Sequence, residues 1–208
     1  MKENFGLYLI LTDPVAGYEA CAEAAVEADL RYLQLRMKNT SQDEIIRMGK
    51  RIKSITDGTR TRLIMNDSLE AAMACDADGI HLGQTDRSLN EARKTWNTPG
   101  KIFGLSTHSL EQALQALELS PDYIGIGPVF PTQTKMDTDP VVGSQEAGRI
   151  AHEIPISSVV IGGIHPANLP KVFQAGATNF CVVSAVNQSP DPRLAIHELQ
   201  QMWKSHTF

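Results

Sequence analysis

The sequence has few cysteines and no excess of positive charge. Its 208 residues include three cysteines, Cys21, Cys75 and Cys181, which are far apart and odd in number. This pattern is typical of neither a disulfide framework nor a zinc site. The apolar neighbours of each cysteine predict a small core residue instead. The formal net charge of −5 argues against a general nucleic-acid-binding protein, which would carry a basic face or stripe.

Signals for a membrane or for secretion are also missing. No window approaches the roughly 18 consecutive apolar residues that indicate a membrane-spanning helix. Residues 1–12 lack a basic region that leads into an apolar run with a small-residue cleavage site, so they do not resemble a signal peptide. We therefore expect a cytoplasmic protein with no membrane partner. A hydrophobic fraction of 42% and a charged fraction of 21% are ordinary for a globular protein.

What the sequence does have is a regular alternation of short β-branched runs with longer amphipathic stretches. The predicted strands are Gly6–Thr12, Arg31–Met37, Arg62–Met65, Gly79–Leu82, Ile102–Ser106, Tyr123–Gly127, Ser157–Ile161 and Phe180–Ser184. The predicted helices are Tyr18–Ala28, Ser41–Thr56, Ser68–Cys75, Ser88–Thr95, Ser109–Leu119, one from about Val142 to about His152, Pro166–Ala175 and Asp191–Lys204. Ser41 and Glu44 form a capping box at the start of the second helix.

Strands that alternate with helices pair in parallel through right-handed crossovers. About eight such units in 208 residues fit an α/β protein with a (β/α)₈ TIM barrel near the lower size limit of that fold. We expect a single barrel domain over residues 1–208. The rival is an open doubly wound sheet, which carries a glycine-rich phosphate loop in its first turn. Thr12–Val15 fills that turn here and contains no glycine.

Cations follow the second predicted strand. A (β/α)₈ barrel has its active site at the carboxyl ends of the strands, and this strand ends Gln34-Leu35-Arg36-Met37-Lys38. Strand alternation puts Gln34, Arg36 and Lys38 on one face. Two cations in a barrel mouth require an anionic partner. Salt bridges to barrel carboxylates are the alternative, and the three polar residues together favour an anion site.

Carboxylates follow the next two strands. Asp67 comes directly after Asn66, and Asp86 ends the segment His81–Asp86. Each carboxylate, taken singly, is interpreted as a helix cap. Together, facing the cations, they predict a Mg²⁺ site that waters and substrate phosphate oxygens complete. His81 lies within a buried strand and is interpreted as a satisfied core histidine, not a catalyst.

Hydroxyl groups follow the fifth and sixth strands. Ser106 is a candidate hydrogen-bond donor to a substrate, and no histidine–carboxylate arrangement marks it as an acyl-transfer nucleophile. Thr132, Thr134 and Lys135 lie on a loop with two prolines. Two hydroxyls and an ammonium suit an oxyanion, and a polar surface loop is the alternative.

Glycine and serine end the last two strands. Gly163 ends the seventh strand just before a predicted helix, and Val183 and Ser184 end the eighth. Glycine lets a phosphate approach the backbone, and phosphate sites after these strands are frequent in this fold; a tight turn is the alternative. The residues thus predict two anion sites, one for a diphosphate and one for a monophosphate. Two phosphorylated small-molecule substrates and no obvious nucleophile indicate direct group transfer in which diphosphate leaves.

A set of motifs then points to a family. The segments are YLILTD (8–13), QLRMK (34–38), MND (65–67), DGIHLGQTD (78–86), GLSTHS (104–109), DYIGIGPVFPTQTK (122–135), IGGI (161–164) and VVSAV (182–186). Their order and spacing resemble the thiamine phosphate synthase family nearly end to end. The chain departs from the family pattern at Ala28-Asp29 and Cys75-Asp76, where glycines are usual.

This resemblance implies a Mg²⁺-dependent transferase with two substrates, 4-amino-2-methyl-5-hydroxymethylpyrimidine diphosphate and 4-methyl-5-hydroxyethylthiazole phosphate. The products would be thiamine monophosphate and diphosphate. The pyrimidine would ionise first, and the thiazole nitrogen would then attack. By this likeness the pyrimidine diphosphate is held by Gln34, Arg36, Lys38 and Asn66, Mg²⁺ by Asp67 and Asp86, and the thiazole phosphate by Gly163, Val183 and Ser184. Ser106 would contact the pyrimidine side, and Thr132, Thr134 and Lys135 would lie over the reacting groups; Arg36, Lys38, Ser106 and Lys135 would be catalytic.

Two other functions remain open at this point. A thiazole tautomerase shares the fold, but that branch generally lacks the complete PTxTK loop, which is intact at 131–135. A non-catalytic thiamine-phosphate binder would be favoured by loss of Asp67, Asp86 or Arg36, and none is lost. The sequence leaves the oligomeric state undecided, with a homo-oligomer as one option.

Overall fold

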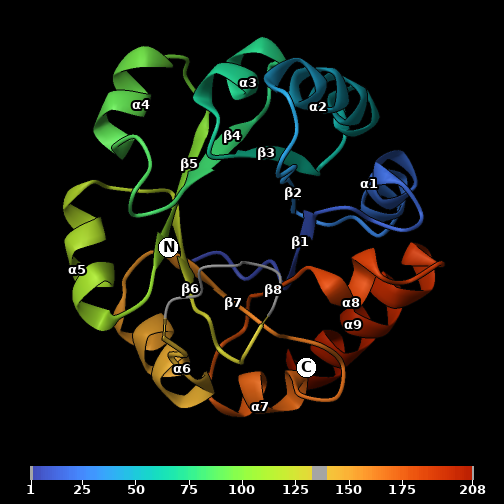
Figure 1. The fold of residues 1–208 in the computed structure, drawn as a ribbon. Coiled ribbons are helices and arrows are strands. Elements are labelled where there is room, and N and C mark those ends of the chain that lie inside the picture. The colour runs from blue at the N-terminus through green and yellow to red at the C-terminus, as the bar shows by residue number, and fades with distance from the viewer. Residues whose placement is uncertain (1, 133–139, 208) are drawn as a thin grey trace.

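Eight parallel strands close into a barrel, and helices surround it (Figure 1). The computed structural model describes residues 2–132 and 140–207. Each strand pairs with its sequence neighbours, and β8 closes the barrel against β1. The α/β class and the (β/α)₈ barrel predicted from the sequence are confirmed.

The elements alternate along the chain as predicted. The strands are β1 (Leu7–Leu11), β2 (Tyr32–Leu35), β3 (Arg62–Asn66), β4 (Gly79–Leu82), β5 (Ile102–Thr107), β6 (Tyr123–Ile126), β7 (Ser157–Ile161) and β8 (Phe180–Val182). The helices of the described residues are α1 (Tyr18–Glu27), α2 (Gln42–Thr56), α3 (Leu69–Ala74), α4 (Leu89–Thr95), α5 (Leu110–Glu118), α6 (Ser144–Glu153), α7 (Leu169–Gln174), α8 (Ser184–Asn187) and α9 (Pro192–Thr207).

Strand residues alternate between two cores. In β1, Leu7, Leu9 and Leu11 belong to the large core between barrel and helices. Tyr8 and Ile10 belong to a smaller core inside the barrel. A strand that is buried on both faces reads as a continuous apolar run, which is why the sequence of β1 is LYLIL.

Tyrosines fill much of the barrel interior. Tyr8 packs against Tyr32 and Tyr123, with ring centroids 5.5 and 5.7 Å apart. Tyr32 and Tyr123 lie 5.6 Å apart. Side-chain layers of this kind make a (β/α)₈ barrel a packed core and not a pore, so these rings form a floor under the carboxyl ends of the strands.

Polar side chains fasten the opposite, amino-terminal end of the barrel. Asp78, Asp122 and Asn179 each directly precede an even-numbered strand. Each accepts a hydrogen bond from the backbone N–H of a neighbouring strand or strand entrance: Asp78 Oδ2 from Leu63 (2.8 Å), Asp122 Oδ2 from Phe103 (2.7 Å), and Asn179 Oδ1 from Phe5 (2.8 Å) and Gly6 (2.9 Å). These bonds use backbone donors that would otherwise lack a partner where the barrel begins.

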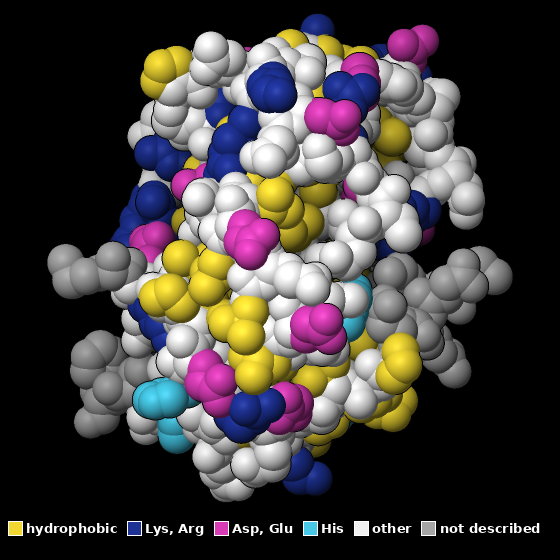
Figure 2. All heavy atoms as spheres, turned by 90° about the vertical axis from the view of Figure 1, so that its left-hand side faces the viewer, with side chains coloured by type: hydrophobic (Ala, Val, Ile, Leu, Met, Phe, Trp, Pro, Cys, Tyr) yellow, Lys and Arg dark blue, Asp and Glu magenta, His cyan; other side chains and the backbone are white. Residues whose placement is uncertain are grey.

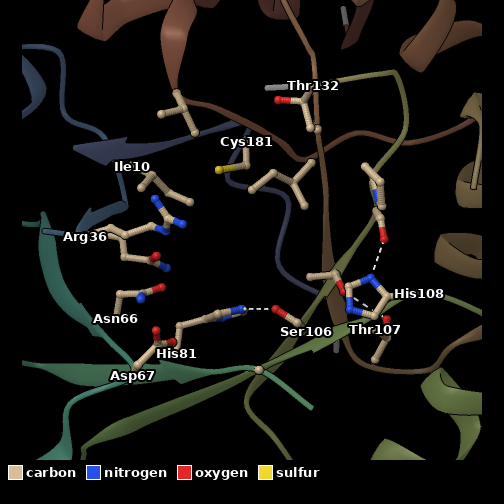
Figure 3. Close-up of a pocket in the computed structure, with 18 of the residues that line it drawn as sticks. Ile10, Arg36, Asn66, Asp67, His81, Ser106, Thr107, His108, Thr132 and Cys181 are labelled. Carbon is tan, nitrogen blue, oxygen red and sulfur yellow. Dashed lines mark hydrogen bonds between the residues drawn. The ribbon is translucent and has the colours of Figure 1, made fainter. Parts of the chain in front are cut away.

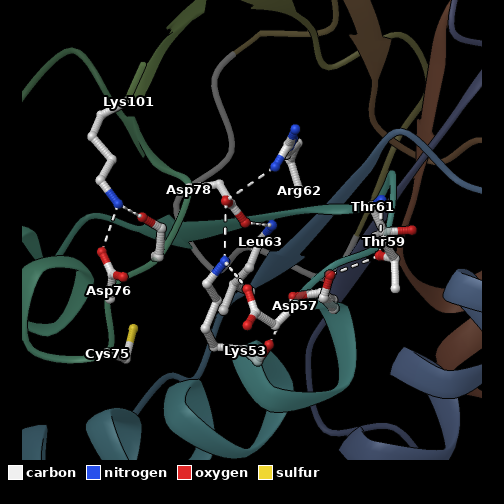
Figure 4. Close-up of polar contacts among 12 residues, drawn as sticks. Lys53, Asp57, Thr59, Thr61, Arg62, Leu63, Cys75, Asp76, Asp78 and Lys101 are labelled. Carbon is white, nitrogen blue, oxygen red and sulfur yellow. Dashed lines mark hydrogen bonds and ion pairs between the residues drawn. The ribbon is translucent and has the colours of Figure 1, made fainter. Parts of the chain in front are cut away.

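Of these three side chains, Asp78 also contacts two cationic side chains (Figure 4). Its side chain is only 14% exposed, and Oδ1 lies 3.2 Å from Lys53 Nζ and 3.6 Å from Arg62 Nη1. Lys53 also reaches Asp57, whose side chain is 76% exposed. This largely buried carboxylate therefore joins α2, β3 and β4 at one point.

The structure corrects the sequence prediction at two element boundaries, the end of β8 and the start of α7. The prediction that β8 continues through Ser184 was wrong, because a short helix, α8, begins at that residue. The prediction that a helix opens at Pro166 was also wrong. The helix α7 begins at Leu169, and residues 165–168 form a turn in which Asn168 Oδ1 accepts the His165 N–H.

The two departures from the family's glycine pattern fall where the backbone is left-handed. Asp29, after α1, has φ 55°, and Asp76, after α3, has φ 52°. Aspartate tolerates this region better than most residues because its short polar side chain can bond locally. Each carboxylate also has a cation nearby: Asp29 pairs with Arg60 at 3.0 Å and Asp76 with Lys101 at 2.7 Å.

The helical exterior mixes charges of both signs. Figure 2 shows the side of the barrel that carries α4 and α5, where cationic and anionic side chains are interspersed with apolar ones. On α6, Arg149 pairs with Glu146 at 2.6 Å and with Glu153 at 2.8 Å. Within the described residues, no helix is long and apolar enough to cross a membrane.

We predict that Asp78→Ala lowers the free energy of unfolding by about 2 kcal/mol, because it leaves a backbone donor and a lysine without their buried acceptor. Asp57→Ala is the matched control. It removes an exposed partner of the same lysine and should change stability by less than about 0.5 kcal/mol. Urea denaturation of both variants measures the difference, and equal effects would contradict the assigned role of Asp78.

Candidate active site

A cavity of about 360 Å³ opens at the carboxyl ends of the strands. Every strand contributes to its lining: Ile10, Gln34, Asn66, His81, Ser106, Gly125, Ile161 and Cys181 come from β1 to β8 in that order. The cavity also brings together the predicted site residues that the structure describes, namely Gln34, Arg36, Lys38, Asn66, Asp67, Asp86, Ser106, Thr132, Gly163, Val183 and Ser184. Thr134 and Lys135 lie outside the described residues.

Arg36 is the unusual cation of this cavity. Its backbone continues the barrel past β2, since its N–H donates to Leu11 O (2.9 Å) and its carbonyl accepts from Thr12 Oγ1 (3.0 Å). Its half-buried side chain points into the cavity (Figure 3) and has no ion pair or hydrogen bond with another side chain of the described residues. Burial lowers the pKa of Arg36, and Asp67 and Asp13 counteract this only in part. Arginine nevertheless keeps its charge at neutral pH, so the cavity holds a cation that has no fixed counter-ion among the residues described.

The carboxylates lie on the neighbouring side. Asp67 Oδ2 lies 2.8 Å from Lys38 Nζ, and Asp86 Oδ2 accepts the Gly83 N–H at 2.7 Å. Burial raises the pKa of Asp86, and the nearby Asp67 carboxylate raises it further. Two carboxylates that repel each other are favourable for a divalent cation. The described residues contain no group of three or more acidic, histidine or cysteine side chains placed for a metal.

The residues present fit Mg²⁺ more than zinc. Magnesium is commonly bound by one or two carboxylates, and waters and substrate phosphates supply the remaining oxygens. Asp67 and Asp86 provide that number and kind of ligand. Lys38 is already paired with Asp67, so its charge is shared between this carboxylate and any bound anion.

His81 and Ser106 meet at the bottom of the cavity (Figure 3). His81 Nε2 lies 2.9 Å from Ser106 Oγ, and Nδ1 lies 3.0 Å from the Tyr123 hydroxyl. Burial lowers the pKa of His81 to about 4, so the ring is neutral at pH 7. The interpretation of His81 as a satisfied histidine is confirmed by these two bonds. What the sequence did not indicate is that this histidine also lines the cavity.

The glycine end of the cavity differs from the expectation in one respect. Gly163 has φ 64°, and a Cβ there would come within 2.6 Å of Pro131 O and 2.9 Å of Phe130 Cβ. The glycine is therefore required by the close approach of the loop after β6, in addition to any phosphate. Because α7 begins only at Leu169, a phosphate at this end would meet the turn around Gly163 and the start of α8, where Ser184 lies.

Other cavity residues were missed by sequence reasoning. They are Ile10, Gly83, Gln84, Thr85, Thr107, His108, Gly125, Gly127, Pro128, Ile161, Gly162, Ile164 and Cys181. The side chain of Gln84 donates to Ser106 O at 2.5 Å, and His108 Nδ1 lies 2.6 Å from Gly127 O. Their positions directly after β4 and β5 were the available signal, because the carboxyl ends of strands face the cavity.

Fold and cavity together define a (β/α)₈-barrel protein whose strand ends form a pocket with a half-buried arginine and two adjacent carboxylates. Comparison with known proteins gives the family. The family model described as thiamine monophosphate synthase matches residues 7–186. The chain belongs to the thiamine monophosphate synthase family.

Individual relatives agree over nearly the whole chain. A thiamine-phosphate synthase of Clostridium botulinum (strain Loch Maree / Type A3) is 38% identical over 203 residues, which cover 96% of this chain and 98% of that protein. One from Halalkalibacterium halodurans is 38% identical over 191 residues and covers 90% of each chain. The solved structure of a thiamine phosphate pyrophosphorylase from Pyrococcus furiosus superimposes with a TM-score of 0.87 at 31% identity and covers 99% of this chain and 98% of its own.

We predict that Arg36→Gln weakens binding of inorganic diphosphate by about tenfold to a hundredfold, because a charge-assisted hydrogen bond is worth roughly 1.5–3 kcal/mol. Isothermal titration calorimetry at fixed ionic strength measures this. Arg47→Gln, which removes an exposed arginine of α2, is the control for net charge and should leave the dissociation constant unchanged. Equal losses in both variants would mean that diphosphate senses only overall charge.

Proposed function

We propose that this chain condenses 4-amino-2-methyl-5-hydroxymethylpyrimidine diphosphate with 4-methyl-5-hydroxyethylthiazole phosphate to give thiamine monophosphate and diphosphate. Family membership supports the activity. The observation that carries the substrate assignment is Arg36, a half-buried cation in the cavity without a counter-ion among the described residues. Such a charge is favourable only when an anion completes it. We expect the enzyme in the cytoplasm, as predicted from the sequence.

The reaction exchanges one bond for another. The C–O bond between the pyrimidine methylene and the diphosphate breaks, and its electron pair leaves with the diphosphate. The lone pair of the thiazole nitrogen then forms the new C–N bond to the methylene carbon. No protein nucleophile is needed, which agrees with a cavity whose serine, Ser106, bonds to a neutral histidine and has no carboxylate behind it.

The protein's part is to hold the reactants and neutralise the leaving group. Arg36 and Lys38 would grip the diphosphate, and Asn66 lies beside them at the end of β3. The loop residues Thr132, Thr134 and Lys135 would close over the reacting groups, as the family resemblance implies. Fixed charges of this kind stabilise the developing negative charge without reorganisation.

Mg²⁺ would be held by Asp67 and Asp86. When bound, it neutralises negative charge on the diphosphate oxygens and so makes diphosphate a better leaving group. The carboxylates themselves must be ionised to bind a cation, and the pKa of Asp86 is raised. Acidic conditions should therefore weaken metal binding first at this residue.

The thiazole phosphate would occupy the other end of the cavity. Gly163, Val183 and Ser184 line that end, and the N–H of Gly163 donates to no group of the described residues. A backbone amide at a glycine turn is a favourable donor to phosphate. The two substrates would then meet across the cavity, with the methylene carbon and the ring nitrogen between the two anion sites.

The proposal is tested by incubating the purified chain with both substrates and Mg²⁺ and measuring thiamine monophosphate.

We predict that Asp86→Asn lowers kcat/KM by at least about a hundredfold at low Mg²⁺, because removing one transition-state charge contact commonly costs roughly 3 kcal/mol. Part of the activity should return at high Mg²⁺. Glu70→Gln, at an exposed glutamate on α3, is the control. Wild-type activity that survives EDTA would contradict the metal site, and no product from the wild type would contradict the function.

A further inference from the structure

A continuous chain of side-chain hydrogen bonds runs beneath the cavity. Gln34 Nε2 donates to the Tyr8 hydroxyl at 2.9 Å, and the Tyr8 and Tyr123 hydroxyls lie 2.8 Å apart. Tyr123 reaches His81 Nδ1 at 3.0 Å, and His81 Nε2 reaches Ser106 Oγ at 2.9 Å. We call these five residues the relay. It joins β2, β1, β6, β4 and β5, and both of its ends line the cavity.

The donation from Gln34 Nε2 to the Tyr8 hydroxyl fixes the direction of the relay. Tyr8 accepts from Gln34, so its own proton goes to its other partner, Tyr123. Tyr123 in turn donates to His81 Nδ1. A neutral imidazole that accepts at Nδ1 carries its proton on Nε2, so His81 donates to Ser106 Oγ.

With Gln34 Nε2 facing Tyr8, the opposite direction is unfavourable. If Tyr123 donated to Tyr8, the Tyr8 oxygen would accept from both Gln34 and Tyr123, and the Tyr8 proton would have no acceptor. Both tyrosines are 1% exposed, so no water would take that proton. A buried donor without a partner is destabilising. Burial also raises the pKa of both phenols, so neither loses its proton to relieve the conflict.

We propose that the relay fixes the hydrogen-bonding polarity of the cavity floor, with an acceptor at Gln34 and a donor at Ser106, and that Tyr8, Tyr123 and His81 are positioning residues. Gln34 uses Nε2 for Tyr8, and its Oε1 has no hydrogen bond with the described residues. Ser106 Oγ accepts from His81, so its proton is directed elsewhere. A ligand in the cavity therefore meets a hydrogen-bond acceptor, Gln34 Oε1, at one end of the relay and a hydrogen-bond donor, the Ser106 hydroxyl, at the other.

This polarity selects one class of ring, and naming the ring rests on the proposed function. A ring that fits carries an amino donor toward Gln34 and a ring-nitrogen acceptor toward Ser106. An aminopyrimidine has both groups. The corresponding oxopyrimidine places a carbonyl oxygen against the Gln34 oxygen and so puts two acceptors together. We expect the amino compound to be preferred by at least about a hundredfold in kcat/KM, because a site built for hydrogen bonds rejects ligands that leave its groups unpaired.

The direct test of the relay needs no substrate. Nitrogen-15 NMR of the histidine-labelled enzyme distinguishes a protonated from an unprotonated ring nitrogen, and the His81 signals are identified by their loss in His81→Gln. We expect a neutral ring protonated at Nε2 in the wild type. A ring protonated at Nδ1 would overturn the proposal.

Tyr123→Phe removes the central link and keeps the ring. Tyr8 can then no longer pass on its proton to Tyr123, and His81 Nδ1 loses its donor, so the Nε2–H form should lose its dominance. The matched control is Tyr32→Phe. Tyr32 packs against the same two rings, but its hydroxyl donates to Glu3 at 3.4 Å, outside the relay.

The KM values for the two substrates distinguish a positioning role of Tyr123 from a purely structural one. Tyr123→Phe should raise KM for the aminopyrimidine diphosphate about tenfold, the value of one hydrogen bond, and reduce the amino-over-oxo preference. KM for thiazole phosphate should stay unchanged. Tyr32→Phe should alter none of these. If thermal melting shows that Tyr123→Phe does not fold, Tyr8→Phe provides the second break in the relay.

The outcomes of the two tests are distinguishable. An inactive wild type with His81 protonated at Nε2 would contradict the proposed function and leave the relay standing. An active wild type with unchanged substrate preference and tautomer in Tyr123→Phe would overturn the relay and leave the function standing.

Discussion

The cavity is organised around the positive charge of Arg36, which no ion pair within residues 2–132 and 140–207 neutralises. The guanidinium of Arg36 is half-buried at the barrel mouth, and no carboxylate of the described residues pairs with it. Asp67, the carboxylate with the larger effect on the pKa of Arg36, is engaged with Lys38. The adjacent Asp86 has a raised pKa because it is partly buried beside another carboxylate. An anion bound to Arg36 would supply its missing counter-ion, and a cation bound to Asp67 and Asp86 would reduce the repulsion between the two carboxylates. A metal–diphosphate pair supplies both charges at once.

The contacts that hold the barrel together lie largely away from the cavity. At the amino-terminal end, Asp78, Asp122 and Asn179 accept backbone hydrogen bonds where strands begin. Inside, the tyrosine rings fill the barrel beneath the cavity. The side chain of Arg36 has no hydrogen bond or ion pair with another side chain of the described residues, so its charge can take a ligand as its partner. The division follows the usual one for this fold, with stability at one end and chemistry at the other.

Much of this was predictable from sequence, and the limits have physical causes. The alternation of strands and helices predicted the barrel, and the strand-end rule placed Arg36 and Asp86 in one cavity, because closure brings all carboxyl ends to one rim. The start of α8 at Ser184 was missed, since an apolar run does not show where a strand turns into a helix. The role of His81 was read only in part. Its hydrogen bonds to Tyr123 and Ser106 depend on how β4 is aligned with β5 and β6. The pattern of apolar and polar residues within one strand does not show that alignment.

The most direct test of the central claim is a crystal structure with Mg²⁺ and a non-hydrolysable aminopyrimidine diphosphate analogue. We predict that the diphosphate lies on the Arg36 guanidinium, that Mg²⁺ bridges it to Asp67 and Asp86, and that the ring lies between Gln34 and Ser106. A diphosphate bound away from the Arg36 guanidinium would contradict the claim that this half-buried charge exists for the leaving group.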